Sequence, residues 1–511
     1  MSSGNMGRQR LWRFLLLFSV AVCAACGLVY ELALISLATS TGGGGIVETS
    51  LIVAGYVAAL GLGAFAVRPL LRWPAESFLA VEAILGVVGG FSAMALYAAF
   101  ALVGQSLLLL VLATAVIGML VGAELPLLLT LVQQGKSVDA RGAGRVVATL
   151  NVADYAGALL GGLAWPFLLL PWLGLIRGTA AAGLLNLVAA LFLACVVLRS
   201  RLSRRRLWAA TLGLLVGCAM ILGLIFLSPA WVVTARQQLY SDPVVYAHQS
   251  QYQDIVVTQR GKDRRLYLNG GLQYSTRDEY RYTESLVYPA LREKGERVLV
   301  IGGGDGLAAR ELSRMDAQVV QVELDPEVIQ VANTVLREDN GGSLENRNVE
   351  VIVDDAFTWL RRGGDGTAFG SVIIDLPDPD NETMARLYSE EFYTLARSVL
   401  APEGRMTVQA SSAYSTPEVF WRVHSTLQAA GCGEVFPYHV MVPTFGDWGF
   451  HLCAPKGASL SLPQDAPPLR YMSPEVLAAA SVFGQDNGPR RMEPSTLDRP
   501  FIVEDMRKGY R

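Results

Sequence analysis

Residues 1–235 contain seven apolar segments, each long enough to cross a lipid bilayer, and this constrains the first half of the chain more than any other feature. About 20 helical residues span the hydrocarbon core, and only helices or closed barrels satisfy the backbone there. The first segment is too long for a cleaved signal peptide and has no clear cleavage site. We therefore expect a multi-span α-helical membrane bundle of about seven transmembrane helices over residues 1–235. The segments are 13–38, 46–67, 78–100, 107–130, 147–171, 175–198 and 208–228.

Positive charges collect in alternate connections between these segments. Arginines precede the first segment and follow the second, fourth and sixth, whereas the other connections hold only Arg177. The positive-inside rule makes the arginine-rich side cytoplasmic. An odd number of spans then places residues 236–511 outside the cytoplasm.

Four carboxylates fall inside the apolar segments, namely Glu31, Glu82, Glu124 and Asp154. Ionisable groups inside a bilayer are costly and often mark an ion or substrate path. Two interpretations stay open from the sequence. The carboxylates form a polar path that suits a polyamine or another cation, or partners inside the bundle cap them.

The second half of the chain has a different composition. It carries 28 Lys and Arg against 38 Asp and Glu, a net charge of −10. This acidic balance disfavours nucleic acid as a partner and is compatible with a cationic substrate. The four histidines lack metal-ligand spacing, so we expect no metal site.

Within the segment 236–290, residues 244–290 alternate polar and apolar side chains as β-strands do. Stretches 252–258 and 265–273 are separated by a turn at 261–263, and a second turn falls at 269–271. This pattern predicts a small β-meander.

From residue 297 the pattern becomes strand, glycine-rich loop, helix and strand. Because ligands of open α/β sheets bind at the carboxyl ends of strands, we expect the polar residues there to converge. The pattern predicts an α/β Rossmann-like domain of the methyltransferase type over residues 291–455. The converging residues are Asp305, Glu323, Asp355, Asp375 and Gln409.

The glycine loop reads Gly302-Gly303-Gly304-Asp305-Gly306, which departs from the G-x-G-x-x-G pattern of dinucleotide-binding folds. Asp305 would repel a pyrophosphate and attract a sulfonium or an ammonium. Asp305 capping the following helix is the alternative reading. The loop from Asp375 to Pro379 has two interpretations. It holds two carboxylates near each other after a buried strand, or it is a surface turn rich in proline and aspartate.

Taken together, these segments resemble the spermidine/spermine synthase (polyamine aminopropyltransferase) family over residues 250–455. The apolar half resembles the membrane-anchored bacterial branch of that family. The segments that match in order are Tyr252-Gln253-Asp254, Gln273, Asp278-Glu279 with Tyr282 and Glu284, the glycine loop, Val322-Glu323-Leu324-Asp325, Asp355-Ala356-Phe357, Asp375 with Asp378-Pro379, Gln409 and Pro443-Thr444. Residues 456–511 are a C-terminal tail that we expect to pack on this domain through Phe483 and Phe501.

The resemblance implies transfer of the aminopropyl group of decarboxylated S-adenosylmethionine to putrescine or a related amine, with release of methylthioadenosine. No cofactor would be bound permanently. In this scheme Asp375 is the catalytic carboxylate. Gln253, Gln273 and Asp305 surround the aminopropyl arm; Gly302 and Gly304 approach the nucleoside; Glu323 holds the ribose; Asp355 meets the adenine; and Tyr282, Asp378 and Gln409 place the diamine.

Two positions depart from the family pattern. Thr283 stands where His or Gln is usual, and Phe445 stands where Tyr is common. They keep open a second interpretation, in which a degenerate synthase domain senses polyamines for a transporting membrane half. A third interpretation is a methyltransferase that uses S-adenosylmethionine, against which Asp305 counts.

The resemblance also implies a homodimer and a multi-pass protein of the bacterial inner membrane. Two arguments conflict over which side of the membrane carries the catalytic domain. The arginine pattern favours the outside, whereas decarboxylated S-adenosylmethionine is made inside the cell. On that chemical ground we expect the cytoplasmic side.

Overall fold

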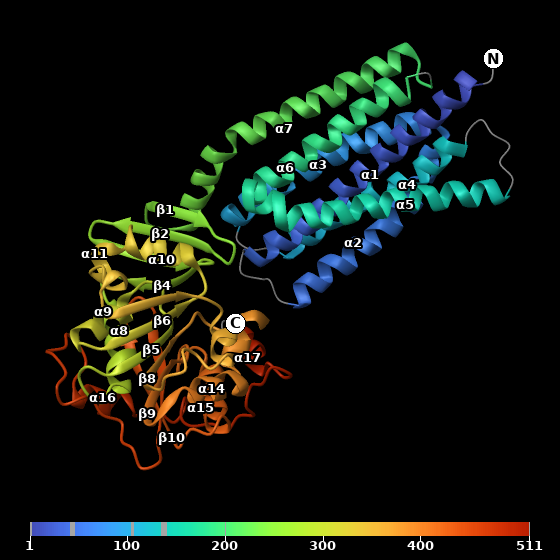
Figure 1. Ribbon diagram of the computed structural model, residues 1–511. Coiled ribbons are helices and arrows are strands. Elements are labelled where there is room, and N and C mark those ends of the chain that lie inside the picture. The colour runs from blue at the N-terminus through green and yellow to red at the C-terminus, as the bar shows by residue number, and fades with distance from the viewer. Residues whose placement is uncertain (1–2, 41–45, 104–106, 134–139, 200, 510–511) are drawn as a thin grey trace. The chain divides into compact units, whose positions relative to one another are not determined.

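The apolar segments of the first half form helices in the computed structural model, which describes residues 3–40, 46–103, 107–133, 140–199 and 201–509 (Figure 1). The chain divides into two compact units, Met1–Ser241 and Asp242–Arg511. The helical unit consists of α1 (Ser3–Ser40), α2 (Ile46–Ala66), α3 (Pro74–Val103), α4 (Leu107–Gln133), α5 (Ala140–Ala164), α6 (Leu170–Phe192) and α7 (Arg204–Leu239), with short turns of tighter or wider helix at Arg68–Arg72, Trp165–Leu169 and Leu193–Val197.

Among the described residues, six helical stretches are long and apolar enough to cross a membrane. One of them, Gly144–Val197, has 54 residues. At 1.5 Å per residue it would be about 81 Å long, far more than the roughly 30 Å of a hydrocarbon core. Gly174 interrupts it with a φ of 71° and a ψ of 178°, which is not helical. This break lies near the start of α6, and the wider turn Trp165–Leu169 separates α5 from α6. The seven apolar segments thus correspond to the seven helices α1 to α7.

The second unit begins with a four-stranded antiparallel sheet in the order β1-β2-β3-β4. The predicted turns are present, because Gly261 and Gly270 both adopt positive φ. The inward side chains, such as Ile255 and Tyr274, share one apolar core with Leu307 and Val328 of the larger α/β part. The strands are β1 (Val244–Gln249), β2 (Asp254–Arg260), β3 (Asp263–Leu268) and β4 (Gly271–Ser275).

A seven-stranded sheet in the order β10-β11-β9-β8-β5-β6-β7 forms the centre of this unit. Strands β5 to β9 pair with one another in parallel, β11 pairs antiparallel with β9, and β10 and β11 form an antiparallel hairpin at one edge. The strands are β5 (Arg297–Gly302), β6 (Gln318–Glu323), β7 (Val349–Val353), β8 (Phe369–Asp375), β9 (Leu400–Gln409), β10 (Glu434–Val442) and β11 (Gly446–Ala454). The Rossmann-like fold expected for this region is thus present.

Helices cover both faces of the large sheet, and successive side chains of β5 point alternately into the two cores. Val298 and Val300 face one core with Leu312, whereas Leu299 and Ile301 face the other with Phe392. Burial on both faces explains the continuous apolar run that predicted a parallel strand. The helices are α8 (Glu279–Val287), α9 (Leu307–Arg314), α10 (Pro326–Asn333), α11 (Arg337–Asn340), α12 (Ala356–Arg361), α13 (Glu382–Ala385), α14 (Glu390–Ser398), α15 (Pro417–Ala429), α16 (Pro474–Ala480) and α17 (Phe501–Gly509).

The C-terminal tail packs on the sheet's helices. The Phe483 ring lies 5.6 Å from Phe420 and 5.2 Å from Trp421, measured between ring centroids. The Arg422 guanidinium lies over the Phe501 ring and pairs with Asp505.

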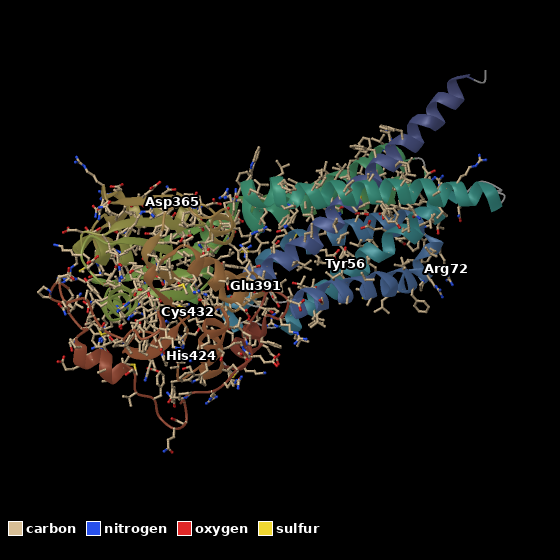
Figure 2. All side chains as sticks on the ribbon, turned by 60° about the horizontal axis from the view of Figure 1, so that its bottom comes forward. Tyr56, Arg72, Asp365, Glu391, His424 and Cys432 are labelled. Carbon is tan, nitrogen blue, oxygen red and sulfur yellow. A yellow bond between two sulfur atoms is a disulfide. The ribbon has the colours of Figure 1, made fainter. Side chains whose placement is uncertain are left out.

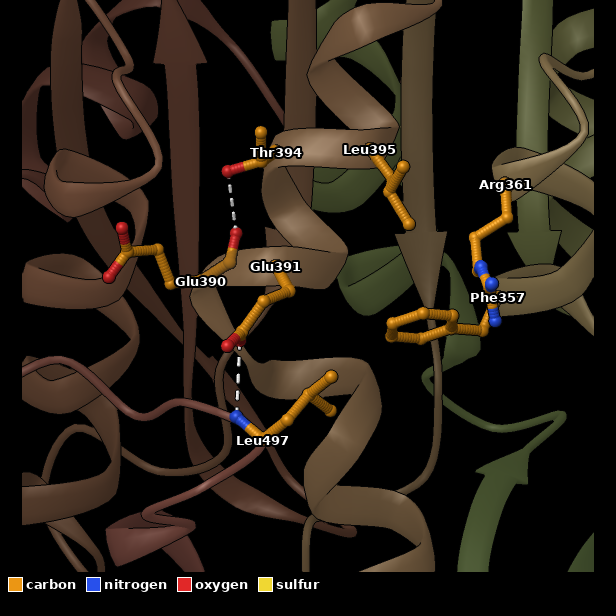
Figure 3. Close-up of a pocket in the computed structure, with 7 residues that line it drawn as sticks. All are labelled: Phe357, Arg361, Glu390, Glu391, Thr394, Leu395 and Leu497. Atoms are coloured by element: carbon orange, nitrogen blue, oxygen red, sulfur yellow. Dashed lines mark hydrogen bonds between the residues drawn. The ribbon is translucent and has the colours of Figure 1, made fainter.

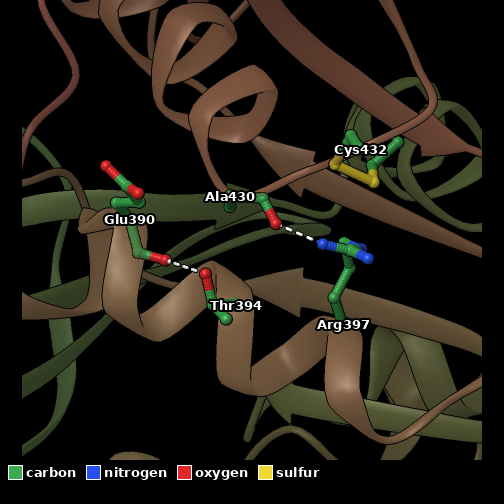
Figure 4. Close-up of a disulfide and its surroundings, with 6 residues drawn as sticks. Glu390, Thr394, Arg397, Ala430 and Cys432 are labelled. Atoms are coloured by element: carbon green, nitrogen blue, oxygen red, sulfur yellow. Dashed lines mark hydrogen bonds between the residues drawn. A yellow bond between two sulfur atoms is a disulfide. The ribbon is translucent and has the colours of Figure 1, made fainter.

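A disulfide joins Cys432, in the turn before β10, to Cys453 in β11, with their Cα atoms 5.5 Å apart (Figure 4). Beside it, the Arg397 guanidinium donates a hydrogen bond to the Ala430 carbonyl. The sequence carries no signal for this pairing, because the two cysteines are isolated residues 21 positions apart.

Candidate functional site

The site is built where β5 and β8 end side by side. Gly302 is in register with Asp375, and the Gly303 N–H donates to the Asp375 carbonyl at 3.0 Å. Gly302 has a φ of 78°, and a Cβ atom there would lie 2.1 Å from that carbonyl oxygen. Only glycine fits this approach. The Gln321 amide holds the loop by donating to the carbonyls of Gly302 and Gly303, at 3.1 and 2.6 Å.

Three carboxyl groups converge at these strand ends: Asp375 after β8, Asp305 after β5 and Glu323 at the end of β6. Burial, followed by the charge of Asp375, raises the pKa of Asp305. Burial also raises the pKa of Asp375 and brings the pKa of Glu323 to about 7. Since a nearby positive charge favours the ionised form, this cluster is suited to a cationic ligand.

Glu323 presses against the glycine loop. A Cβ atom on Gly304 would lie 2.7 Å from Glu323 Oε2. The other oxygen, Oε1, accepts the N–H of Asp325 at 3.0 Å, which opposes the rise in the pKa of Glu323. Asp305 Oδ1 accepts the Leu307 N–H at 2.9 Å. Asp305 therefore caps α9 and also faces Asp375.

Tyr282 of α8 closes one side of the cluster. Its hydroxyl donates to Asp375 Oδ1 at 2.6 Å and thereby opposes the effect of burial on the pKa of Asp375. The ring stands edge-on to Phe445 and Phe450, with centroids 6.0 and 5.3 Å away, and Trp448 lies 6.5 Å away. The result is an aromatic wall beside a carboxylate, an arrangement that binds alkyl ammonium groups through their chain and their charge.

The sequence model of the Spermine/spermidine synthase domain matches residues 279–461. A polyamine aminopropyltransferase of Corynebacterium efficiens is 67% identical over 505 residues, which cover 98% of this chain and 97% of the relative. One from Mycobacterium tuberculosis is 57% identical over 510 residues, with 98% and 97% covered. The chain belongs to the polyamine aminopropyltransferase family. The resemblance drawn from the sequence is thereby confirmed, and so is the expectation of an enzyme.

Solved structures are more distant. A crystal structure of spermidine synthase in complex with the transition-state analogue AdoDATO is 23% identical, covers 48% of this chain and 86% of that chain, and has a TM-score of 0.44.

Among the residues expected to bind the aminopropyltransferase substrates, Gln253 and Asp378 lie in small polar networks. Gln253 donates to Asp325 Oδ2 at 3.0 Å, and Asp325 also caps α10. Asp378 Oδ1 accepts the Ser411 hydroxyl at 2.6 Å. Ser411 has a φ of 57°, a conformation that is unusual for serine.

Three other predicted residues are engaged elsewhere. The Gln273 amide donates to the Gly271 carbonyl of its own hairpin at 3.1 Å. Asp355 caps α12 through Thr358 and pairs with Arg386, and these partners lower its pKa in spite of burial. The buried Gln409 amide donates to the Leu376 carbonyl and the Tyr388 hydroxyl. In this arrangement the Gln409 amide supports the loop that follows Asp375 through its bond to the Leu376 carbonyl.

Sequence reasoning missed several contributors to this aminopropyltransferase site. Asp325 lies in a motif that we noted, but its bonds to Gln253 and Ser250 follow only from the fold. Tyr388 has no local signal. Asp278 accepts both the N–H and the hydroxyl of Thr444, at 2.8 and 2.7 Å, and thereby ties the start of α8 to the β10–β11 turn.

A surface groove lies between α12 and α14, outside the strand-end cluster (Figure 3). Within it, Glu391 accepts the Leu497 N–H of the tail at 3.1 Å, and the Thr394 hydroxyl bonds back to the Glu390 carbonyl. The bond from Leu497 to Glu391 holds the tail against α14. The groove contains none of the predicted substrate residues.

Proposed function

We propose that the strand-end cluster transfers an aminopropyl group from decarboxylated S-adenosylmethionine to putrescine or a closely related amine. The observation that carries the proposal is the half-buried Asp375 carboxyl, held by Tyr282 next to Asp305. An alkylammonium is no nucleophile until it loses a proton, and Asp375 is the base at that end. The sulfonium is already an activated leaving group. The amine nitrogen forms the new C–N bond as the C–S bond breaks and methylthioadenosine leaves.

On the co-substrate side, Glu323 accepts the ribose hydroxyls, and Gly302 and Gly304 allow the backbone to approach the nucleoside. Asp305 and Gln253 face the aminopropyl arm. Most of the rate enhancement comes from alignment of nitrogen, carbon and sulfur, an effect that reaches roughly 7–11 kcal/mol in well-oriented systems.

On the amine side, Tyr282 and Asp378 place the diamine along the aromatic wall. Phe445 supplies an apolar face where the family often has a hydroxyl. This favours an acceptor whose chain lies against the ring over one that needs a hydrogen bond there.

We also propose that residues 1–235 form a multi-pass bundle in the bacterial inner membrane. Large apolar side chains on its outer faces support this, among them Phe167, Trp172 and Phe226 with 75%, 79% and 79% of their surface exposed. Soluble surfaces rarely carry so many. Residues 236–290 and 291–455 then serve as the two parts of the synthase.

The proposed enzyme is tested with the purified full chain, decarboxylated S-adenosylmethionine and a panel of amines. Methylthioadenosine release should depend on one amine. Asp375→Asn should lower turnover at least about 100-fold, the usual contribution of a general base, with nucleoside binding retained. Asp365→Asn makes the same change at a surface ion pair with Arg297 and should leave turnover unchanged.

Loss of nucleoside binding in a folded Asp375→Asn protein would contradict the base role. Product from S-adenosylmethionine in place of the decarboxylated compound would instead favour the methyltransferase reading.

A further inference from the structure

Four helices of the helical unit bring polar side chains to one buried region among apolar neighbours. These residues are Tyr30 of α1, Glu82 of α3, Glu124 of α4 and Asn186 of α6, each at most 5% exposed. They lie outside the aminopropyltransferase machinery, so the reaction described above does not account for them.

Glycines bring α3 and α6 together at this point. A Cβ atom on Gly183 would lie 2.5 Å from the Gly86 carbonyl oxygen and 2.8 Å from Gly90 Cα. Gly86 lies about one helical turn after Glu82, and Asn186 follows Gly183 by three residues. The close backbone contact allows the Asn186 amide to donate to the Glu82 carbonyl at 3.2 Å.

The α1 helix contributes Tyr30 in a similar way. A Cβ atom on Gly89 would lie 2.6 Å from the Cζ atom of Tyr30, so the ring lies directly on α3. Cys23 lies two helical turns before Tyr30 on the same face of α1, and the carboxyls of Glu82 and Glu124 act electrostatically on its thiol. This face of α1 therefore lies toward both carboxyls.

Several polar atoms in this region are buried and have no hydrogen-bond partner among the described residues: Tyr30 Oη, both carboxyl oxygens of Glu82, Glu124 Oε1 and Asn186 Oδ1. A buried polar atom without a partner costs roughly 1–3 kcal/mol, and such atoms are rare in native proteins. The carboxyl and carboxamide oxygens are acceptors, whereas the Tyr30 phenol can donate a single proton, so this region holds more unpartnered acceptors than donors.

Further carboxyls lead away from this region. Glu31 of α1 and Asp154 of α5 are half-buried, and with Glu124 they lie within electrostatic reach of the Tyr56 hydroxyl. Tyr56, which is labelled in Figure 2, donates to the Gly27 carbonyl at 3.2 Å. Carboxyls inside a helical membrane bundle often mark a substrate or ion pathway.

A positively charged group rich in N–H donors matches these acceptors when the carboxyls are ionised. A primary ammonium supplies three donors and one charge. Among the described residues, no group of three or more His, Cys, Asp and Glu side chains is arranged to hold a metal ion. We propose that Glu82, Glu124, Tyr30 and Asn186 form a second amine site, which binds the ammonium group of a small aliphatic amine inside the helical bundle. The choice of putrescine as the probe rests on the proposed function of the other unit.

The test measures equilibrium binding of radiolabelled putrescine to the purified full chain in lipid nanodiscs. The wild-type chain should bind one equivalent more than Glu82→Gln, and the variant should retain methylthioadenosine release. Glu76→Gln is the matched control, because Glu76 begins the same helix and pairs with Arg206 at the surface. It should bind as the wild type does.

A second variant guards against misfolding. Tyr30→Phe keeps the ring against Gly89 and removes only the hydroxyl, so it should weaken the extra site roughly ten-fold, the effect of one hydrogen bond to a charged group. Its thermal transition without putrescine should be unchanged. If folded Glu82→Gln and Tyr30→Phe both bind putrescine as the wild type does, the proposed site is wrong. This is also the result expected if the carboxyls hold only protons. If Glu82→Gln binds one equivalent of putrescine less than the wild type, and neither protein releases methylthioadenosine, the second amine site is upheld and the proposed enzyme is refuted.

Discussion

At the scale of single residues, the site depends on one hydrogen bond between Tyr282 and Asp375. Burial raises the pKa of Asp375, and the phenol stabilises its ionised form. The proposed base works only when ionised, so kcat/KM should fall as the pH drops through the raised pKa. Activity is therefore retained on the alkaline side of this limb.

Tyr282→Phe removes the bond and leaves burial in place, so the pKa of Asp375 should rise further. The acid limb of the pH–kcat/KM profile should move to higher pH by roughly one unit, since a hydrogen bond to a charged group is worth about 1.5 kcal/mol. Tyr280→Phe, two positions earlier on the same helix, should leave the limb in place. If the acid limb does not move in Tyr282→Phe, the Tyr282 phenol does not control the pKa of Asp375.

Residue identities were predictable where chemistry alone selected them. Asp375, Asp305 and Glu323 follow strands whose burial is visible in the sequence, so their convergence followed from parallel-sheet geometry. Gln409 also ends such a strand, yet its amide turns to the Leu376 carbonyl. The position of a side chain along a strand does not set its rotamer, which depends on neighbours far away in the sequence, such as Tyr388.

At the scale of elements, α8 and the β10–β11 turn act as one support. Asp278 binds Thr444 twice, so the helix that carries Tyr282 and the turn that carries Phe445 are joined. Neither residue touches the proposed reacting atoms. They are positioning residues for the amine side.

Thr444→Val removes the hydroxyl and keeps the size of the side chain and the N–H bond. We expect the KM for the amine to rise about three- to ten-fold, with the KM for the nucleoside unchanged, because one hydrogen bond to a carboxylate is lost. Steady-state kinetics with each substrate varied separately check this. Thr394→Val is the matched control, since the Thr394 hydroxyl bonds only within its own helix. An equal rise in both KM values would point to general unfolding instead.

The β10–β11 hairpin shows why some elements could not be predicted. Strand β10 contains Pro437, which normally argues against a strand. In the structure β10 is the outermost strand of the sheet, where a missing N–H is tolerated. Edge position is a property of the finished sheet, and nothing local to residues 434–442 reports it.

At the scale of the whole molecule, two independent features bear on the side of the membrane that carries the synthase. Five arginines lie at 199, 201 and 204–206, immediately before the apolar part of α7, and make that side cytoplasmic. A single crossing by α7 puts residues 242–511 on the opposite side. The disulfide between Cys432 and Cys453 agrees, because disulfides are rare in the cytosol. Both features weigh against the cytoplasmic side that the co-substrate chemistry favours.

We therefore expect the Cys432–Cys453 pair to be oxidised in cells and the second unit to be reachable from outside. A membrane-impermeant maleimide on intact spheroplasts should label K262C, at the exposed β2–β3 turn, above the background of the wild type. R72C, at the end of the arginine-bearing connection after α2, should react only after lysis (Figure 2). The reverse pattern would place the synthase in the cytosol, next to its co-substrate. The expected pattern would require the nucleoside sulfonium, the amine or both to cross the membrane before they react, and the buried carboxyls of the helical unit would then lie on a route for the amine.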